Sequence, residues 1–223
     1  MRPIVIGLLL AGAGIITWLI LARPDKKAGT EETPKQQALA VSKHSNAFNA
    51  SVANTLNSYE KLSELFVNWD SASVNATAQS LLTDVSSINL DELKKDSSAI
   101  YETAAAFIEN AKGDLQTISL EKGIRQQREA FNNLTDNFYQ FLNTVQYDRE
   151  KLYLQRCPMA FDDVQSATWL SKKEEIRNPY LGLRDPKYGK AMLECGETIK
   201  VLNEEIADAP KASKSEVTTD KHH

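Results

Sequence analysis

Apolar side chains recur at helical spacing through residues 44–145, and this periodicity constrains the fold more than any other feature. From Phe48 to Phe66 the apolar positions stand three or four residues apart, which is the spacing of one face of an α-helix. The pattern predicts a helix over residues 44–68. Its inward face is Phe48, Val52, Leu56, Tyr59, Leu62 and Phe66.

Three further helices follow from the same pattern. Asp70 is a suitable N-cap for the second helix. The third is predicted to begin between residues 89 and 91 and to end at Ala111, where residues 112–114 read as a C-cap and turn, and Ser119 is a candidate cap for the fourth. The predicted inward residues of the second helix are Val74, Ala78, Leu81 and Val85. Those of the third are Leu93, Ile100, Ala104, Phe107 and Ile108, and those of the fourth are Ile124, Phe131, Leu134, Phe138, Phe141, Leu142 and Val145. Short connections between such helices predict an all-α fold, an up-and-down bundle of about four helices.

The helical period is lost over residues 153–202, where prolines, glycines and aromatic residues alternate. We expect a small irregular C-terminal lobe here, with short strands at residues 151–155 and 197–202. A segment with so little regular structure must pack on the bundle, be clamped by a bond or metal, or both.

All the sulfur of the chain beyond the initiator methionine lies in this lobe, as Cys157, Met159, Met192 and Cys195. Thiolates and thioethers together are the soft ligand set that favours Cu(I), so these four residues are the candidate metal ligands. Paired CxxC motifs and a nearby histidine, which a zinc site would call for, are lacking. The alternatives are a Cys157–Cys195 disulfide with the methionines filling gaps in the core, or two free thiols with a structural role.

The N-terminal residues predict an association with a membrane. Residues 3–22 carry no charged side chain, and this is about the length needed to cross a bilayer as a helix. We therefore expect a transmembrane anchor, or a cleaved signal segment, at residues 1–23. A flexible linker over residues 24–43, a folded domain over 44–205 and a disordered tail over 206–223 would follow.

Charge and motifs argue against several classes of function. The net charge is −4 and basic residues are not clustered with aromatic ones, so no nucleic-acid partner is expected. The sequence shows neither a Ser-His-Asp set nor a glycine-rich phosphate loop, and His44, expected at the surface, is the one histidine of the folded region. An enzyme is therefore the least expected class, and no small-molecule substrate is evident.

The C-terminal motifs resemble those of a family known as domain of unknown function 3347. The resemblance rests on Cys157-Pro158-Met159-Ala160, Trp169-Leu170-Ser171, residues 175–180 (EIRNPY) and residues 190–196 (KAMLECG), with QREAF at 127–131 in the helical part. It implies an exported bacterial protein. Related domains stand at the C-terminus of some CusB-type adaptor subunits of heavy-metal efflux pumps, which implies a role near copper.

By position, the resemblance makes Cys157, Met159, Met192 and Cys195 the candidate soft ligands, with Trp169, Asn178, Pro179 and Tyr180 shaping the lobe around them. The sequence departs from the family pattern at residues 181–187 (LGLRDPK), where the link to Met192 is longer. The departure puts the role of Met192 in question.

Two functions are thus expected from the sequence. The first is a single-pass bacterial inner-membrane protein with a periplasmic domain, or a secreted periplasmic one, that binds Cu(I) in an envelope efflux complex. The second is a non-catalytic structural or interaction domain of the envelope, held by a Cys157–Cys195 disulfide.

Overall fold

The computed structural model describes residues 43–206. The helices are α2 (Asn46–Asn68), α3 (Ser71–Ser86), α4 (Ser98–Leu120) and α5 (Ile124–Thr144), with the short 3-10 helices η1 (Asp91–Lys95) and η2 (Lys190–Met192). The strands are β1 (Leu152–Phe161), β2 (Gln165–Ser171) and β3 (Glu197–Leu202). Within residues 43–206 no helix is both long enough and apolar enough to cross a membrane. The expected anchor at 1–23, linker at 24–43 and tail at 206–223 fall outside the described residues, apart from Lys43 and Ile206.

The first two helices follow the prediction closely. Ser45 caps α2 by accepting a hydrogen bond from the Phe48 N–H, and Asp70 caps α3 by accepting one from the Ser73 N–H. All the predicted inward residues of these two helices are buried. The capping residues and the spacing of the apolar residues therefore both predict α2 and α3 correctly.

The predicted end of the third helix at Ala111 is wrong, because α4 continues through Gly113 to Leu120. Gly113 faces open space, and the next two inward positions, Leu115 and Ile118, are fully buried. Their burial outweighs the cost of about 1 kcal/mol for a glycine inside a helix. The predicted start at residues 89–91 is the separate η1. Ser119 caps no helix, and Gly123 is the N-cap of α5.

The prediction of an all-α fold with an irregular C-terminal lobe is also wrong. The lobe contains an antiparallel sheet with strand order β2-β1-β3. The predicted strand at residues 151–155 is the first half of β1. Two features concealed the rest of this strand: it is buried at most positions, so its apolar pattern does not alternate, and Pro158 lies within it. The pairing of β1 with β2 is irregular between Cys157 and Phe161, which is where a strand tolerates a proline. The predicted strand at residues 197–202 coincides with β3.

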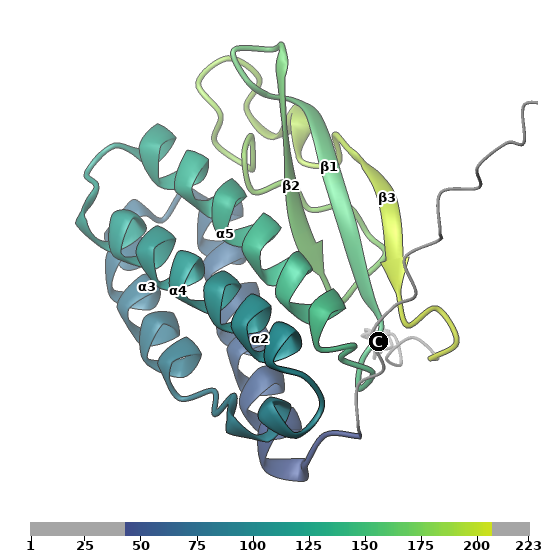
Figure 1. The fold of residues 1–223 in the computed structure, drawn as a ribbon. Helices are drawn as coiled ribbons and strands as arrows, with labels where there is room; N and C mark the ends of the chain where they lie inside the picture. The colour runs from purple at the N-terminus through teal and green to yellow at the C-terminus, as the bar shows by residue number, and fades with distance from the viewer. Residues whose placement is uncertain (1–42, 207–223) are drawn as a thin grey trace, which may run out of the picture. The chain divides into compact units, whose positions relative to one another are not determined.

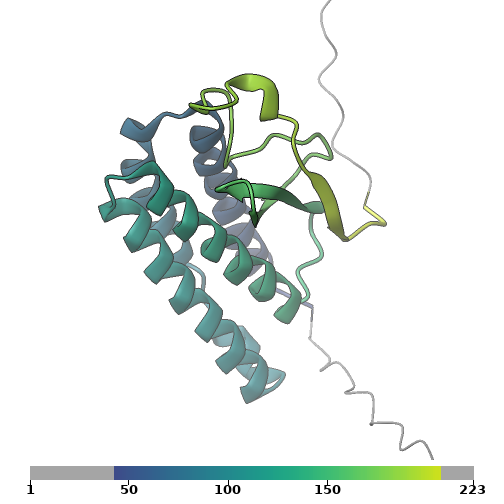
Figure 2. The ribbon, with the colours of Figure 1, turned by 90° about the horizontal axis from the view of Figure 1, so that it is seen from above.

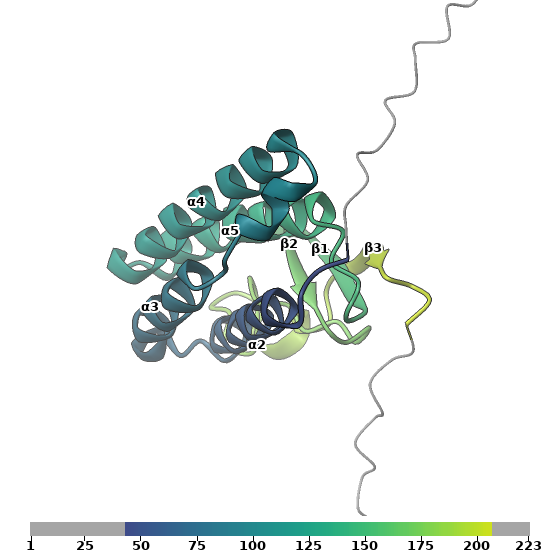
Figure 3. The same cartoon turned by 60° about the horizontal axis from the view of Figure 1, so that its bottom comes forward.

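The sheet packs on the side of the bundle formed by α2 and α5 (Figures 1 and 3). An aromatic cluster fills the space between them. Tyr59 of α2 stacks on Phe131 of α5 with ring centroids 5.1 Å apart, and Tyr180 of the lobe lies 6.1 Å from Phe131. The Tyr59 hydroxyl also accepts a hydrogen bond from the Leu170 N–H of β2. The bundle and the sheet therefore share one core.

Arg128 of α5 links the helices to the lobe. Its guanidinium donates hydrogen bonds to the Phe66 carbonyl, near the end of α2, and to the Pro179 carbonyl, each at 2.9 Å. The Trp69 ring lies 4.1 Å from the guanidinium carbon. Burial lowers the pKa of Arg128 to about 10, so the side chain stays charged at neutral pH. A cation at the C-terminal end of a helix is favourable because the last carbonyls carry partial negative charge.

Arg128→Met is expected to lower the free energy of unfolding by about 2 to 4 kcal/mol, because the Pro179 carbonyl loses the guanidinium donor and the Phe66 carbonyl keeps only the Trp69 N–H. Urea denaturation followed by circular dichroism measures the change. Arg125→Met on the same helix is the matched control, since the Arg125 side chain is exposed and pairs with Asp162 at the surface. Equal midpoints for the two variants would contradict the assigned role of Arg128.

Asp114 of α4 is a half-buried carboxyl group whose protonation should make stability depend on pH. Burial, with a smaller contribution from the nearby Asp136, raises the pKa of Asp114 to about 6, although a hydrogen bond from Asn137 acts in the opposite direction. The folded state therefore keeps its proton at a pH where the unfolded chain has lost it. This contribution to stability is present at low pH and is lost as the pH rises through about 6.

Asp114→Asn is therefore expected to stabilise the chain at pH 7.5 and to have little effect at pH 4. Asparagine retains an oxygen that can accept from Asn137, and the gain is on the order of 1 kcal/mol after solvent screening of this half-exposed site. Thermal unfolding at the two pH values tests it, with the exposed Asp148→Asn as control. A gain of the same size at both values would contradict the assignment.

Candidate functional site

Strand register decides where the two cysteines lie. In the antiparallel pairing of β1 with β3, Arg156 faces Glu197. Cys157 follows Arg156, and Cys195 stands two residues before Glu197, so both come to the same end of the same strand pair. Residues far apart in the sequence therefore meet. The sequence predicts the two strands in part, at residues 151–155 and 197–202, but not their pairing.

Gly196 allows the close approach of these two segments. A Cβ at this position would lie 2.8 Å from the Arg156 carbonyl oxygen and 3.0 Å from the Trp169 ring, and its φ is +150°. Every other residue type would push the segment away from β1. Sequence reasoning missed this residue, and its one available signal was a glycine directly after Cys195.

The two cysteines are free thiols in different environments. Cys157 is fully buried and Cys195 is partly exposed. Burial raises the pKa of the Cys157 thiol to about 11, and the thiol of Cys195 lies close enough to raise it as well. The Met159 N–H and the Asn178 side chain act in the opposite direction, because they favour the thiolate. The pair thus combines a buried thiol with a thiol on a partly exposed residue.

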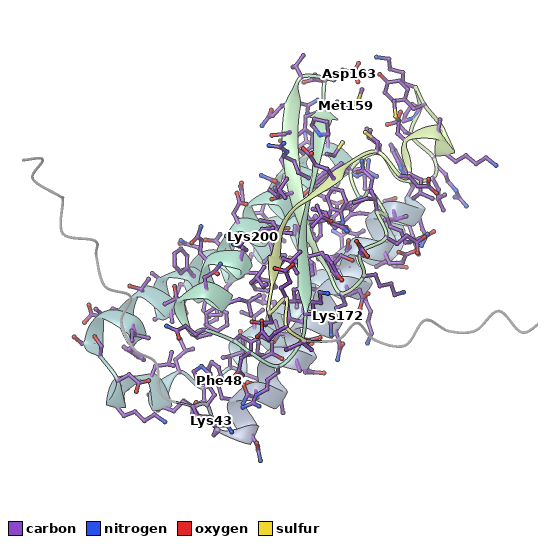
Figure 4. The ribbon with its side chains drawn as sticks, turned by 90° about the vertical axis from the view of Figure 1, so that its right-hand side faces the viewer. Lys43, Phe48, Met159, Asp163, Lys172 and Lys200 are labelled. Atoms are coloured by element: carbon purple, nitrogen blue, oxygen red, sulfur yellow. The ribbon has the colours of Figure 1, made fainter. Side chains whose placement is uncertain are left out.

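The methionines lie at the same end of the sheet. Met159 and Met192 are partly buried and pack against the core. Met192 ends η2, and its carbonyl accepts a hydrogen bond from the Cys195 N–H at 3.1 Å. Figure 4 shows the yellow sulfur atoms near the labelled Met159, at the end of the sheet away from Lys43. The structure thus brings the two thiols together and places both thioethers near the same end of the sheet.

The connection that leads to Met192 contains a hydrogen-bonded turn. The Asp185 carboxylate accepts hydrogen bonds from the Lys187 and Tyr188 N–H groups, each at 2.9 Å. Asp163, at the tip of the β1–β2 hairpin, pairs with Lys187 and accepts from the Tyr188 hydroxyl at 2.9 Å. Lys187 and Tyr188 therefore hold this connection against the tip of the hairpin, near Met159 (Figure 4).

The start of this connection rests on the α2–α3 turn. The Leu183 N–H donates to the Val67 carbonyl at 2.8 Å, and the Trp69 indole donates to the Leu181 carbonyl at 2.9 Å. Figure 2 shows the yellow-green segment lying along this end of the helices. The helical bundle therefore supports the segment that carries Met192 and Cys195.

His44 takes no part in this site. Its ring is 8% exposed, so the expectation of a surface histidine is wrong. Nε2 donates to the Val145 carbonyl at 2.6 Å, and Nδ1 lies 3.0 Å from Glu92 Oε1. His44 adjoins Lys43, at the end of the domain opposite Met159 (Figure 4). The imidazole joins α2 to η1 and to the end of α5, and it offers no base to either cysteine.

The arrangement suits a soft monovalent ion better than a harder one. No group of three or more His, Cys, Asp or Glu side chains placed to hold a metal occurs within residues 43–206. A four-ligand zinc set of the usual kind is thus lacking in this part of the chain. Two thiolates with thioether neighbours are a donor set for Cu(I) and related ions.

The comparisons with known proteins support the family but give no function. The model of the family described as "Protein of unknown function (DUF3347)" matches residues 55–150. The match confirms the resemblance and covers α3, α4 and α5 with most of α2, so all four sulfur residues lie beyond it. No curated protein and no solved structure matches the chain.

Iodoacetamide at pH 8 is expected to label Cys195 rapidly and Cys157 slowly in the folded, reduced chain. The reason is that burial and the raised pKa keep Cys157 protonated and inaccessible. Peptide mass spectrometry after timed quenching gives both rates. Cys195→Ser should remove the fast reaction and Cys157→Ser should retain it, whereas equal rates at both thiols in the native chain would refute the assignment.

Proposed function

We propose that this chain binds one soft monovalent metal ion, Cu(I) or Ag(I), through the thiolates of Cys157 and Cys195. The observation that carries the proposal is the neighbouring position of these two free thiols at one end of the sheet. Met159 and Met192 supply thioether contacts from the two segments that flank the thiols. The protein is non-catalytic in this role.

The ion compensates for the burial of charge at the site. Two free thiolates in this position would repel each other, and burial already disfavours the first of them. A monovalent cation between them leaves a single net negative charge, which the Met159 N–H and the Asn178 side chain are placed to stabilise. A divalent ion would require further ligands, which this part of the chain is poorly equipped to give.

The cellular setting is part of the same proposal. The uncharged residues 3–22 would anchor the chain in a bacterial inner membrane, or direct it to the periplasm if they are cleaved. The sulfur residues lie at the end of the domain away from Lys43, the first residue that the structure describes (Figure 4). A tethered domain of this kind would pass its ion to a heavy-metal efflux complex of the envelope.

The second candidate function is a structural or interaction domain with a Cys157–Cys195 disulfide. It rests on the same neighbouring thiols, together with the oxidising compartment that an exported chain would meet. The mass of protein purified without reductant separates the two functions. A mass lower by two hydrogens favours the disulfide, and two alkylatable thiols favour the metal-binding function.

Reduced protein titrated with Ag(I) against a competing chelator is expected to bind one ion per chain. Cys157→Ser or Cys195→Ser should abolish this binding, and Met159→Leu or Met192→Leu should weaken it by less. Because thiol protons are displaced, the affinity should fall as the pH falls, by about tenfold per pH unit for each proton. Isothermal titration calorimetry at two pH values measures both effects.

The double variant Cys157→Ser with Cys195→Ser is the control for adventitious binding. Wild-type protein that binds no Ag(I), or a double variant that binds as tightly as the wild type, would refute the proposal. Circular dichroism of each variant ensures that a loss of binding does not reflect a loss of folding.

A further inference from the structure

Asn178 lies between the two cysteines and is fully buried. It stands in the connection between β2 and η2, directly before Pro179 and Tyr180. Its backbone N–H donates to the Leu193 carbonyl at 2.8 Å, which ties the connection to the segment leading into Cys195. Asn178 is thus placed to influence both halves of the dithiol.

Backbone contacts fix the orientation of the Asn178 amide. Its Oδ1 accepts hydrogen bonds from the Tyr180 N–H at 2.8 Å and from the Leu181 N–H at 3.2 Å. Two donors at the oxygen exclude the flipped amide, because the flip would aim the NH2 group at these N–H groups. The NH2 group must therefore point the other way, toward the cysteines.

The NH2 group reaches both cysteine residues. One N–H donates to the Cys195 carbonyl at 2.8 Å, which holds the backbone of this residue close to β1. The same group lies next to the Cys157 side chain. An amide carries two N–H donors, so it can serve the carbonyl and the sulfur together.

We propose that Asn178 is the positioning residue of the two-thiol site: it holds Cys195 beside Cys157 and donates to the Cys157 sulfur when that sulfur carries the metal. This inference rests on the proposed function. Residues that donate to a metal ligand orient it and adjust its charge, and their loss commonly costs about 10- to 100-fold in affinity. Asn178 makes such a contact with one thiol and fixes the backbone of the other.

Asn203 provides a matched control for the structural part of this role. Its NH2 group donates to the Tyr147 and Glu150 carbonyls, at 2.9 and 2.8 Å, just after β3. Asn203 therefore fastens backbone segments as Asn178 does, at the other end of β3 from Cys195. A purely structural contribution would affect both variants alike, and only Asn178 should affect the metal site.

The experiment compares Ag(I) affinity in Asn178→Asp and Asn203→Asp. The aspartate at 178 keeps an oxygen for the Tyr180 and Leu181 N–H groups, loses the NH2 donors and adds a negative charge beside Cys157. We expect Ag(I) affinity to fall by about 10- to 100-fold in Asn178→Asp and to stay near the wild-type value in Asn203→Asp. A folded Asn178→Asp variant with wild-type affinity would overturn the proposal.

NMR spectroscopy of the native chain tests the contact without a variant, in case Asn178→Asp does not fold. The side-chain NH2 resonances of Asn178 should shift on addition of one equivalent of Ag(I), and those of Asn203 should not. Unchanged Asn178 resonances in an Ag(I)-loaded chain would refute the contact with the metal-bound sulfur.

Alkylation of the metal-free chain separates failure of this inference from failure of the proposed function. If wild-type protein binds no Ag(I), the proposed function falls, but the positioning of Cys195 is still tested by its rate of reaction with iodoacetamide. Asn178→Asp should change this rate by releasing the Cys195 backbone, and Asn203→Asp should not. Equal Cys195 rates in the wild type and in Asn178→Asp would overturn the positioning role as well.

Discussion

The antiparallel pairing of β1 with β3 is the constraint on which the site depends. The two strands come from opposite ends of a long connection, and their register sets Arg156 against Glu197. As a consequence, Cys157 and Cys195 lie at the same end of this strand pair. Gly196 then lets the segment that holds Cys195 come closer to β1 than a side chain at this position would allow. A site of this kind needs no short sequence motif, because hydrogen bonding between strands supplies the proximity.

The bundle supports this pairing through a few buried polar contacts. Arg128 reaches from α5 to the carbonyls of Phe66 and Pro179, and Asn178 next to Pro179 reaches on to Cys195. Because the Arg128 guanidinium and the Asn178 amide have defined partners, alternative packings of the lobe would leave these donors or their acceptors unpaired, at a cost of about 1–3 kcal/mol each. The helices that match the family model thus support a dithiol that lies outside the match.

The sequence predicted the helices well and the sheet poorly, for physical reasons. The inward faces of α2 and α3 were readable because one-sided burial imposes a period on the apolar residues. Only the first half of β1 was predicted, because the strand is buried at most positions and contains Pro158. Leu115 and Ile118 continued the helical period beyond Gly113, but the glycine was read as a stop. For the site, sulfur chemistry marked Cys157 and Cys195, and the roles of Gly196 and Asn178 became clear only with their contacts.

X-ray absorption at the copper edge of the Cu(I)-loaded native chain tests the two-thiol site most directly, because it reports the atoms bound to the ion. A first coordination shell made of sulfur alone is the predicted result. A shell containing nitrogen or oxygen, or a spectrum unchanged when both cysteines are replaced by serine, would contradict it.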